Sequence, residues 1–236
     1  MCTVSFVVAN EQIIITSNRD ESVGRPSALK PEKYIVNNKN IIFPKDPKAG
    51  GTWFATTENG TVAVLLNGAK EKHQVKDSYR RSRGLILLDI ISSNAPLEEW
   101  KYIDLMNIEP FTLVLYLNKE LYQLQWNEIE KEIVLLDQSM HHIWSSPTLY
   151  SSEVRLLRVH WFEKFMNEQQ ELNPLNLFDF HQNTASENKD FGLIINRNNS
   201  LKTLSITQAV VKKNEIEFSH LDLQHQKHFV NSYSIQ

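Results

Sequence analysis

Asn59-Gly60 stands between two short apolar runs, residues 52–56 and 62–66. An Asn-Gly pair in that position predicts a two-residue β-hairpin of type I′, because both residues tolerate the positive φ that this turn requires. Similar pairs of runs flank residues 9–12 and Asn118-Lys119. The sequence therefore predicts a chain built largely from antiparallel hairpins.

Helical patterns interrupt these strands at three places. Ser82, Pro96 and Ser151 or Ser152 stand where a helix is expected to begin. The third helix is predicted to bury one apolar face, made of Val154, Leu157, Trp161, Phe165 and Met166. Residues 173–189 have a polar, loop-like composition, and residues 191–195 resemble a strand. His220, His225 and His228 lie near a polar C-terminus, where an exposed tail is expected.

Composition bounds the class of protein. A chain of 236 residues with 41% hydrophobic content is long enough to bury a sizeable core, and we expect one domain over residues 1–236. A net charge of −3 argues against a nucleic-acid partner, whose usual footprint is basic. No apolar run approaches the ~18–20 residues of a membrane span, and the N-terminus does not resemble a signal peptide, so we expect a cytoplasmic protein. Because adjacent strand residues point to opposite faces, His141-His142 does not indicate a metal site.

The only cysteine, Cys2, occupies a position with particular chemistry. Removal of Met1 would leave a thiol and a free α-amine on one residue, and the amine, with a pKa near ~7.7–8.0, could accept the thiol proton. The hairpin over residues 4–17 would return Arg19 and Asp20 to the neighbourhood of Cys2. The alternative is a buried small hydrophobe at position 2 and a solvated charged strand end at residues 19–21.

These segments together resemble a known family. Asn18-Arg19-Asp20-Glu21 spells the motif that names the NRDE family, also called the Transport and Golgi organisation protein 2 family, and Met1-Cys2 is similar to the start of that family. Further similar segments are Arg25-Pro26-Ser27, Gly50-Gly51-Thr52-Trp53-Phe54, residues 60–67 and Ser82-Arg83-Gly84. The resemblance is strongest over the first ~90 residues.

The family in turn resembles the N-terminal-nucleophile cysteine hydrolases, the branch with penicillin V acylase and bile salt hydrolase. This implies an α+β fold of four layers, αββα, with two antiparallel sheets between helices. It implies Cys2 as nucleophile, Arg19 beside the thiolate, Asp20 beside the ammonium and Asn67 as oxyanion donor. Asn18, Trp53 and Ser146 are further candidates for substrate or oxyanion binding. Ser146 stands where the branch has a second asparagine, and only Arg197 and Lys202 lie near the expected place of a late arginine.

The resemblance implies hydrolysis of a non-peptide acyl-amide bond without a cofactor or metal, the partner being a small-molecule acyl-amide or lipid-like ligand. The alternative is a non-catalytic protein that keeps the fold and binds a lipid, an acyl-CoA or haem. The basic residues of segment 70–83 fit either a solvated loop or contact with an acidic substrate.

Overall fold

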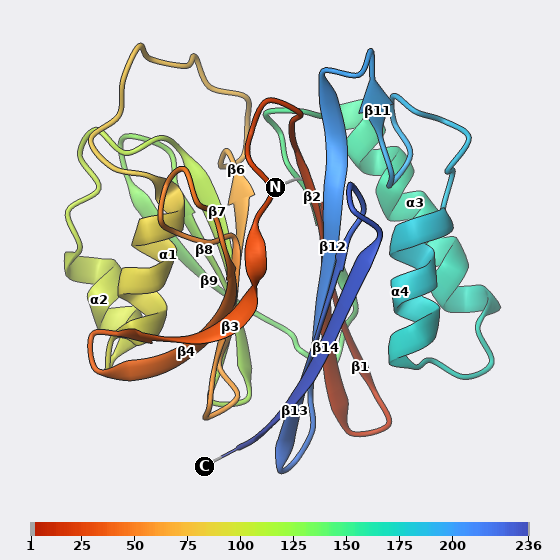
Figure 1. Ribbon diagram of the computed structural model, residues 1–236, viewed down its shortest axis with the longest axis horizontal. Coiled ribbons are helices and arrows are strands. Elements are labelled where there is room, and N and C mark those ends of the chain that lie inside the picture. The colour runs from red at the N-terminus through yellow and green to blue at the C-terminus, as the bar shows by residue number, and fades with distance from the viewer. Residues whose placement is uncertain (1–2, 236) are drawn as a thin grey trace.

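The computed structural model describes residues 3–235, which form four layers. Two β-sheets face each other, one pair of helices covers the outer face of one sheet, and the second pair covers the outer face of the other (Figure 1). The helices are α1 (Arg83–Ser92), α2 (Pro96–Tyr102), α3 (Ser152–Glu168) and α4 (Pro174–Asn183). The α+β, αββα fold implied by the sequence is confirmed.

The first sheet lies under α3 and α4. Its strand order is β10-β1-β2-β12-β13-β14, with β11 also paired to β12, and all of these pairs are antiparallel. The strands are β1 (Thr3–Ala9), β2 (Gln12–Ser22), β10 (His142–Ser145), β11 (Asn196–Arg197), β12 (Leu201–Val211), β13 (Glu215–Asp222) and β14 (Lys227–Ser234). The strand that carries the Asn-Arg-Asp-Glu motif, β2, is thus central to this sheet.

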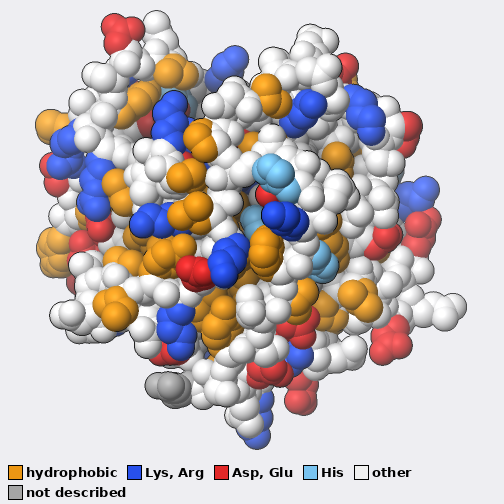
Figure 2. All heavy atoms as spheres, in the orientation of Figure 1, with side chains coloured by type: hydrophobic (Ala, Val, Ile, Leu, Met, Phe, Trp, Pro, Cys, Tyr) orange, Lys and Arg blue, Asp and Glu red, His pale blue; other side chains and the backbone are white. Residues whose placement is uncertain are grey.

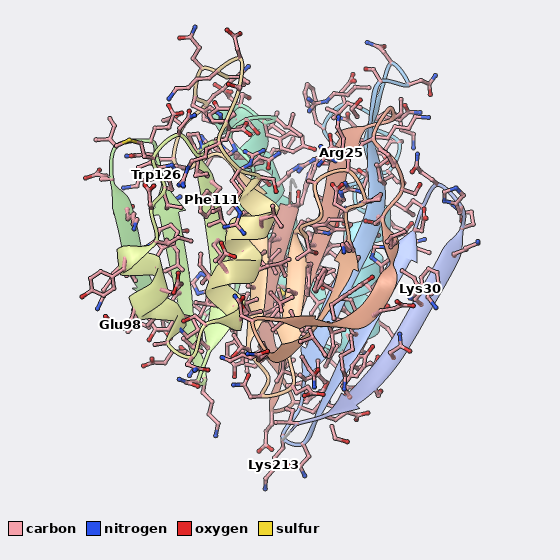
Figure 3. All side chains as sticks on the ribbon, turned by 60° about the vertical axis from the view of Figure 1, so that its left-hand side comes forward. Arg25, Lys30, Glu98, Phe111, Trp126 and Lys213 are labelled. Carbon is pink, nitrogen blue, oxygen red and sulfur yellow. The ribbon has the colours of Figure 1, made fainter. Side chains whose placement is uncertain are left out.

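The second sheet lies under α1 and α2 and follows the chain more simply. Its order is β3-β4-β5-β6-β7-β8-β9, again antiparallel. The strands are β3 (Leu29–Val36), β4 (Lys39–Lys45), β5 (Phe54–Thr57), β6 (Val62–Asn67), β7 (Phe111–Leu117), β8 (Glu120–Trp126) and β9 (Lys131–Leu136). In Figure 3, Arg25 lies in the upper part of the molecule and Lys213 at the bottom.

The alternation of side chains along β1 divides the apolar core. Val4 and Phe6 belong to the large cluster between the sheets and under α1, whereas Val7 joins a smaller cluster under α3 and α4. Phe162 and Phe180 supply the helical side of the smaller cluster, with ring centroids 5.5 Å apart. One strand therefore connects both hydrophobic layers.

Two glycines hold the start of α1 against the loop before β5. A Cβ added to Gly51 would lie 2.5 Å from the carbonyl carbon of Gly84, and one added to Gly84 would lie 2.6 Å from the carbonyl oxygen of Thr52. These distances are too short for any side chain, so the close backbone approach requires glycine at both positions. The contact fixes Arg83 at the rim of the site described below.

Three sequence predictions for the C-terminal half are wrong. Residues 173–189 are not simply a loop, because they contain α4, which begins with the Asn173 side chain accepting the backbone N–H of Asn176 and with Pro174 in the first turn. His220 is not in an exposed tail, since it is buried in β13 and its Nδ1 lies 2.8 Å from the Thr207 hydroxyl. Residues 191–195 also form no strand.

Two local details also differ from expectation. The hairpin at Asn59-Gly60 forms, but only Gly60 has a positive φ, of 85°, so the turn is not type I′. Along α3 the buried residues are Arg158 and Phe162, while Leu157 is 39% exposed. A buried arginine thus lies where the apolar stripe was predicted.

Charged side chains of both signs are interspersed over the face seen in Figure 2. Within residues 3–235, none of the helices has the length and apolar character needed to cross a bilayer.

Candidate active site

A cleft of about 830 Å³ opens where β2 and β6 end. Of the residues predicted from the sequence, Arg19, Trp53 and Asn67 line it. Further lining residues come from four segments that are distant in sequence: Arg25, Asp46, Lys48, Tyr79, Arg83 and Glu109. The fold therefore gathers the first half of the chain around one concave site.

Arg19 is fixed by two contacts in this cleft. Its guanidinium carbon lies 4.1 Å from the ring centroid of Trp53, and its Nη2 donates to Asp46 Oδ2 at 3.1 Å. Only 4% of Arg19 is exposed. Stacking on an aromatic face and pairing with a carboxylate together hold the guanidinium in one orientation.

Asp46 connects this arginine to a second one. Its Oδ2 also accepts from Arg25 Nε at 2.7 Å, and its Oδ1 accepts the backbone N–H groups of Lys48 and Ala49. Burial alone would raise the pKa of Asp46, but the bonds from Arg25 and Ala49 and the charge of Arg19 outweigh burial and lower it. Sequence reasoning missed this role, because the Asp46-Pro47 step carried only a turn signal.

Asp20 follows Arg19 but points to the opposite face of the sheet, as neighbouring strand residues do. Its carboxylate accepts the Tyr150 hydroxyl at 2.5 Å and the Thr203 hydroxyl at 2.6 Å. The register of β12 against β2 shifts between Thr203, which pairs with Asp20, and Ser205, which pairs with Arg19. A bulge of this kind re-aims side chains locally.

Asn18 also lies on the helix-facing side and not in the cleft. Its Nδ2 donates to the carbonyls of His181 and Leu193, so its Oδ1 accepts from His181 Nδ1 at 2.5 Å. The Nε2 of His181 then accepts from the Ser5 hydroxyl at 2.7 Å. Burial, with the charge of Arg158, lowers the pKa of His181 to about 3, so the ring is neutral at pH 7. This network joins β1, β2 and α4.

Asn67 ends β6 and is tied to the other sheet through its backbone. The Ser146 hydroxyl donates to the Asn67 carbonyl at 2.7 Å and lies 2.8 Å from the Thr148 hydroxyl. Gly68 has φ of 82°, and a Cβ there would lie 2.9 Å from Pro147 and Thr148 side-chain atoms. Ser146 therefore supports the strand end that presents Asn67.

Arg158 is the buried arginine that sequence reasoning missed. Its Nη1 donates to the Thr3 hydroxyl at 2.5 Å, and its other nitrogens donate to the carbonyls of Phe191 and Gly192. The guanidinium also lies 3.6 Å from the ring centroid of Tyr150. Its sequence signal was an arginine inside a helical stripe of apolar residues.

Arg197 lies over the same Tyr150 ring, 5.0 Å from its centroid, and is not a lining residue of the cleft.

Cys2 lies outside the described residues. The residue after it in sequence, Thr3, pairs with Asn18 on one side and with Ser145 on the other. Val4 and Phe6, the next residues of β1 with an inward side chain, point into the core between the sheets.

The basic residues of segment 70–83 are largely ion-paired. Lys70 binds Glu132, Lys76 binds Glu128, Arg80 binds Asp104 and Arg81 binds Asp89. Arg83 pairs with Glu109 at 2.9 Å, and burial lowers its pKa. The pairs of Lys70, Lys76 and Arg80 fit the interpretation of a charged surface loop. Arg81 and Arg83 instead line the cleft, as contact with an acidic substrate would require. Across residues 3–235, no cluster of three His, Cys, Asp or Glu side chains could hold a metal ion.

A family model described as Transport and Golgi organisation 2 matches residues 1–228. The chain belongs to this family. None of the curated proteins matches its sequence. Among solved structures, it is similar to the N-acylethanolamine-hydrolyzing acid amidase ortholog of Caenorhabditis elegans, with a TM-score of 0.62 and 10% identity over 88% of this chain and 92% of that chain. It is also similar to a mutant of the conjugated bile acid hydrolase of Clostridium perfringens, with a TM-score of 0.51 and 9% identity over 99% and 96% of the two chains. At these identities the similarity identifies the fold.

Proposed function

We propose that this family member is an N-terminal cysteine hydrolase that cleaves a non-peptide acyl-amide bond in a small molecule of the cytoplasm. The observation that carries the proposal is the convergence of Arg19 and Asn67 on one cleft. Both residues belong to segments that resemble hydrolase motifs. The fold shared with two amide hydrolases supports the same reaction class.

In this mechanism the Cys2 sulfur attacks the amide carbonyl carbon, and the Cys2 α-amine accepts the thiol proton. The amine returns that proton to the leaving nitrogen as the C–N bond breaks, which leaves an acyl thioester and a free amine. Water then attacks the thioester, releasing a carboxylic acid and regenerating the thiol. Removal of Met1 is a precondition, because the base is the α-amine itself.

The chain's other site residues have distinct proposed roles. The Asn67 amide donates to the oxygen that becomes negative in the tetrahedral intermediate. Arg19, held by Trp53 and Asp46, supplies positive charge that favours the thiolate. Asp20, anchored by Tyr150 and Thr203, stabilises the ammonium form of the α-amine across the end of β2.

One observation favours a second function, in which the fold binds a lipid-like ligand without turnover. The Ser146 hydroxyl stands where related hydrolases have an asparagine, and it donates its hydrogen to the Asn67 carbonyl. A hydroxyl has a single hydrogen to donate, so Ser146 cannot also donate to the oxyanion while this bond is in place.

The deciding experiment begins with the intact mass of untagged protein before and after a short iodoacetamide pulse at about pH 6.5, below the ordinary thiol pKa. The expected result is loss of Met1 and alkylation faster than that of free cysteine. A panel of N-acyl amides is then assayed, with Cys2→Ala as the control without a nucleophile and Cys2→Ser as the control that replaces the thiol by a hydroxyl; both keep the α-amine. Retained Met1, or a thiol no faster than free cysteine, would favour the binding protein.

A further inference from the structure

A second hollow lies beside the cleft, where the end of the second sheet meets β10 and α3. It is a groove of about 500 Å³, and a neighbouring hollow of about 300 Å³ shares Ala69, Lys70 and Gln125 with it. We call the two together the α3 groove. Strand β6 separates the α3 groove from the cleft, because Leu65 and Asn67 line the cleft whereas Leu66 lines the groove.

The facing walls of the larger hollow, from β10 and α3, are mainly apolar, whereas the smaller hollow is lined mostly by polar and charged residues. Ile143 and Trp144 of β10 form one side, and Leu156 and Val159 of α3 form the other. Trp144 is held in place because its Nε1 donates to Gln123 Oε1 at 2.8 Å. Leu156 is 68% exposed and borders the larger hollow, so its side chain is accessible to a ligand there. The larger hollow also carries polar and charged side chains, among them Lys70, Gln125 and Arg155. A concave site of this size that combines apolar walls with convergent polar groups is typical of small-molecule binding.

Gln125 places a buried acceptor in this groove. Its Nε2 donates to Thr112 Oγ1 at 2.9 Å, and that hydroxyl donates to the Gly68 carbonyl at 3.0 Å. The chain of donors fixes which end of the amide is the oxygen. Gln125 is only 7% exposed, and its Oε1 has no hydrogen-bond partner in the described part of the chain. A buried acceptor in this state is costly unless a ligand or water donates to it.

Arg155 supplies the complementary group. Its Nη1 donates to the Lys70 carbonyl at 3.1 Å and its Nη2 lies 3.9 Å from Glu71, but its Nε, also buried, has no partner among residues 3–235. The groove thus presents one unsatisfied acceptor and one unsatisfied donor beside apolar walls. A carboxamide carries both an N–H and a carbonyl oxygen, whereas a carboxylate carries acceptors only.

We propose that the α3 groove binds an aliphatic carboxamide, with the amide N–H donated to Gln125 Oε1, the amide oxygen accepting from Arg155 Nε and the alkyl chain between β10 and α3. The proposal concerns a site distinct from the cleft and does not depend on hydrolysis. Arg155 alone would favour a carboxylate, so a preference for the amide reports on Gln125.

In the test, the Cys2→Ala protein is titrated at about pH 7 with octanamide and, separately, with octanoate, and isothermal titration calorimetry measures the binding of each. We expect octanamide to bind at least about tenfold more tightly than octanoate, because the acid cannot donate to Gln125. No binding of octanamide up to its solubility limit, as when a bound water satisfies Gln125, would overturn the proposal. Equal or tighter binding of octanoate would overturn it too.

A matched pair of variants locates the ligand. Leu156 and Leu157 are adjacent exposed leucines of α3, but only Leu156 lines the groove. Leu156→Asp should weaken octanamide binding by about tenfold or more, while Leu157→Asp should leave it unchanged. Gln125→Met should remove the preference over octanoate. If Asn67→Ala abolishes binding and Leu156→Asp does not, the ligand lies in the cleft and the proposal fails.

Discussion

The Arg158 guanidinium, from the middle of α3, donates a 2.5 Å hydrogen bond to the Thr3 hydroxyl, 155 residues away in the chain. Thr3 is the residue that follows Cys2, and it also pairs with Asn18 of the signature motif. A fully buried cation therefore anchors the first described residue of β1 to the outer helix layer.

Arg158→Met should destabilise the protein strongly. The change leaves the Thr3 hydroxyl and the Gly192 carbonyl without this donor, and each buried orphan costs about 1–3 kcal/mol. We expect the free energy of unfolding in urea to fall by about 3 kcal/mol or more. Lys164→Met, at an exposed position of the same helix, is the control and should change it by less than about 0.5 kcal/mol.

Asn67→Ala should lower turnover of an amide substrate by roughly 10²–10³, the usual loss when one oxyanion donor is removed. Unfolding should change little, because the Ser146 bond is to the Asn67 backbone, which the substitution keeps. The measurement is kcat alongside a urea unfolding curve, with Asn94→Ala, outside the cleft, as the control. Activity within a few-fold of wild type would remove Asn67 from the oxyanion site.

Arg19→Met should raise the pKa of the Cys2 thiol, because it removes the buried cation proposed to favour the thiolate. The pKa is read from the rate of iodoacetamide alkylation as a function of pH. Arg25→Met removes the second arginine that binds Asp46 and is the matched control. Equal pKa shifts in the two variants would indicate a general effect of cleft charge instead of a specific role for Arg19.

Acid should destabilise the fold through His181. Its pKa is about 3 in the folded state, below the ordinary value of 6.5, so the unfolded chain binds the additional proton between these values. Stability is therefore full above pH 6.5 and decreases as the pH falls towards 3. Between about pH 6.5 and 4.5, this histidine alone should lower the free energy of unfolding by about 2–3 kcal/mol. The free energy of unfolding in urea, measured across that pH range, should depend less steeply on pH for His181→Gln than for the wild type. An unchanged pH dependence would assign the acid sensitivity to other groups such as His220.

Gly51→Ala should be poorly tolerated, since the new methyl would lie 2.5 Å from the Gly84 backbone. Gly24→Ala is a suitable comparison, because its nearest neighbour would be 3.8 Å away and its φ is not positive. We expect Gly51→Ala to lower the free energy of unfolding by about 1–3 kcal/mol and Gly24→Ala to leave it almost unchanged. Thermal unfolding of both variants measures the difference. Similar melting temperatures for both would show that the start of α1 shifts freely.

Local sequence signals predicted much of the fold and part of the site. Turn residues between apolar runs located the hairpins of β1–β2, β5–β6 and β7–β8. The motif segments contained Arg19, Trp53 and Asn67, which the fold brings to one cleft. α4 was missed because its polar composition concealed it, although Asn173-Pro174 carried the N-cap and first-turn signal.

The missed site residues depend on contacts distant in sequence. Asp46 is 27 residues from Arg19, and Arg158 is 155 residues from Thr3. No local pattern specifies such pairs, because they form only when the layers pack. The opposite faces of Arg19 and Asp20 could have been deduced from strand alternation, but which face bordered the cleft could not.

The division of the signature motif between two faces of one strand affects how variants of this protein are interpreted. Asn18 and Asp20 are hydrogen-bonded to α4, Tyr150 and β12, whereas Arg19 faces the cleft. In a mutational scan that measures cellular abundance, substitutions at Asn18 should reduce protein level, and those at Asn67 should not. A missense change in the motif that abolishes function is therefore not in itself evidence of a lost substrate contact.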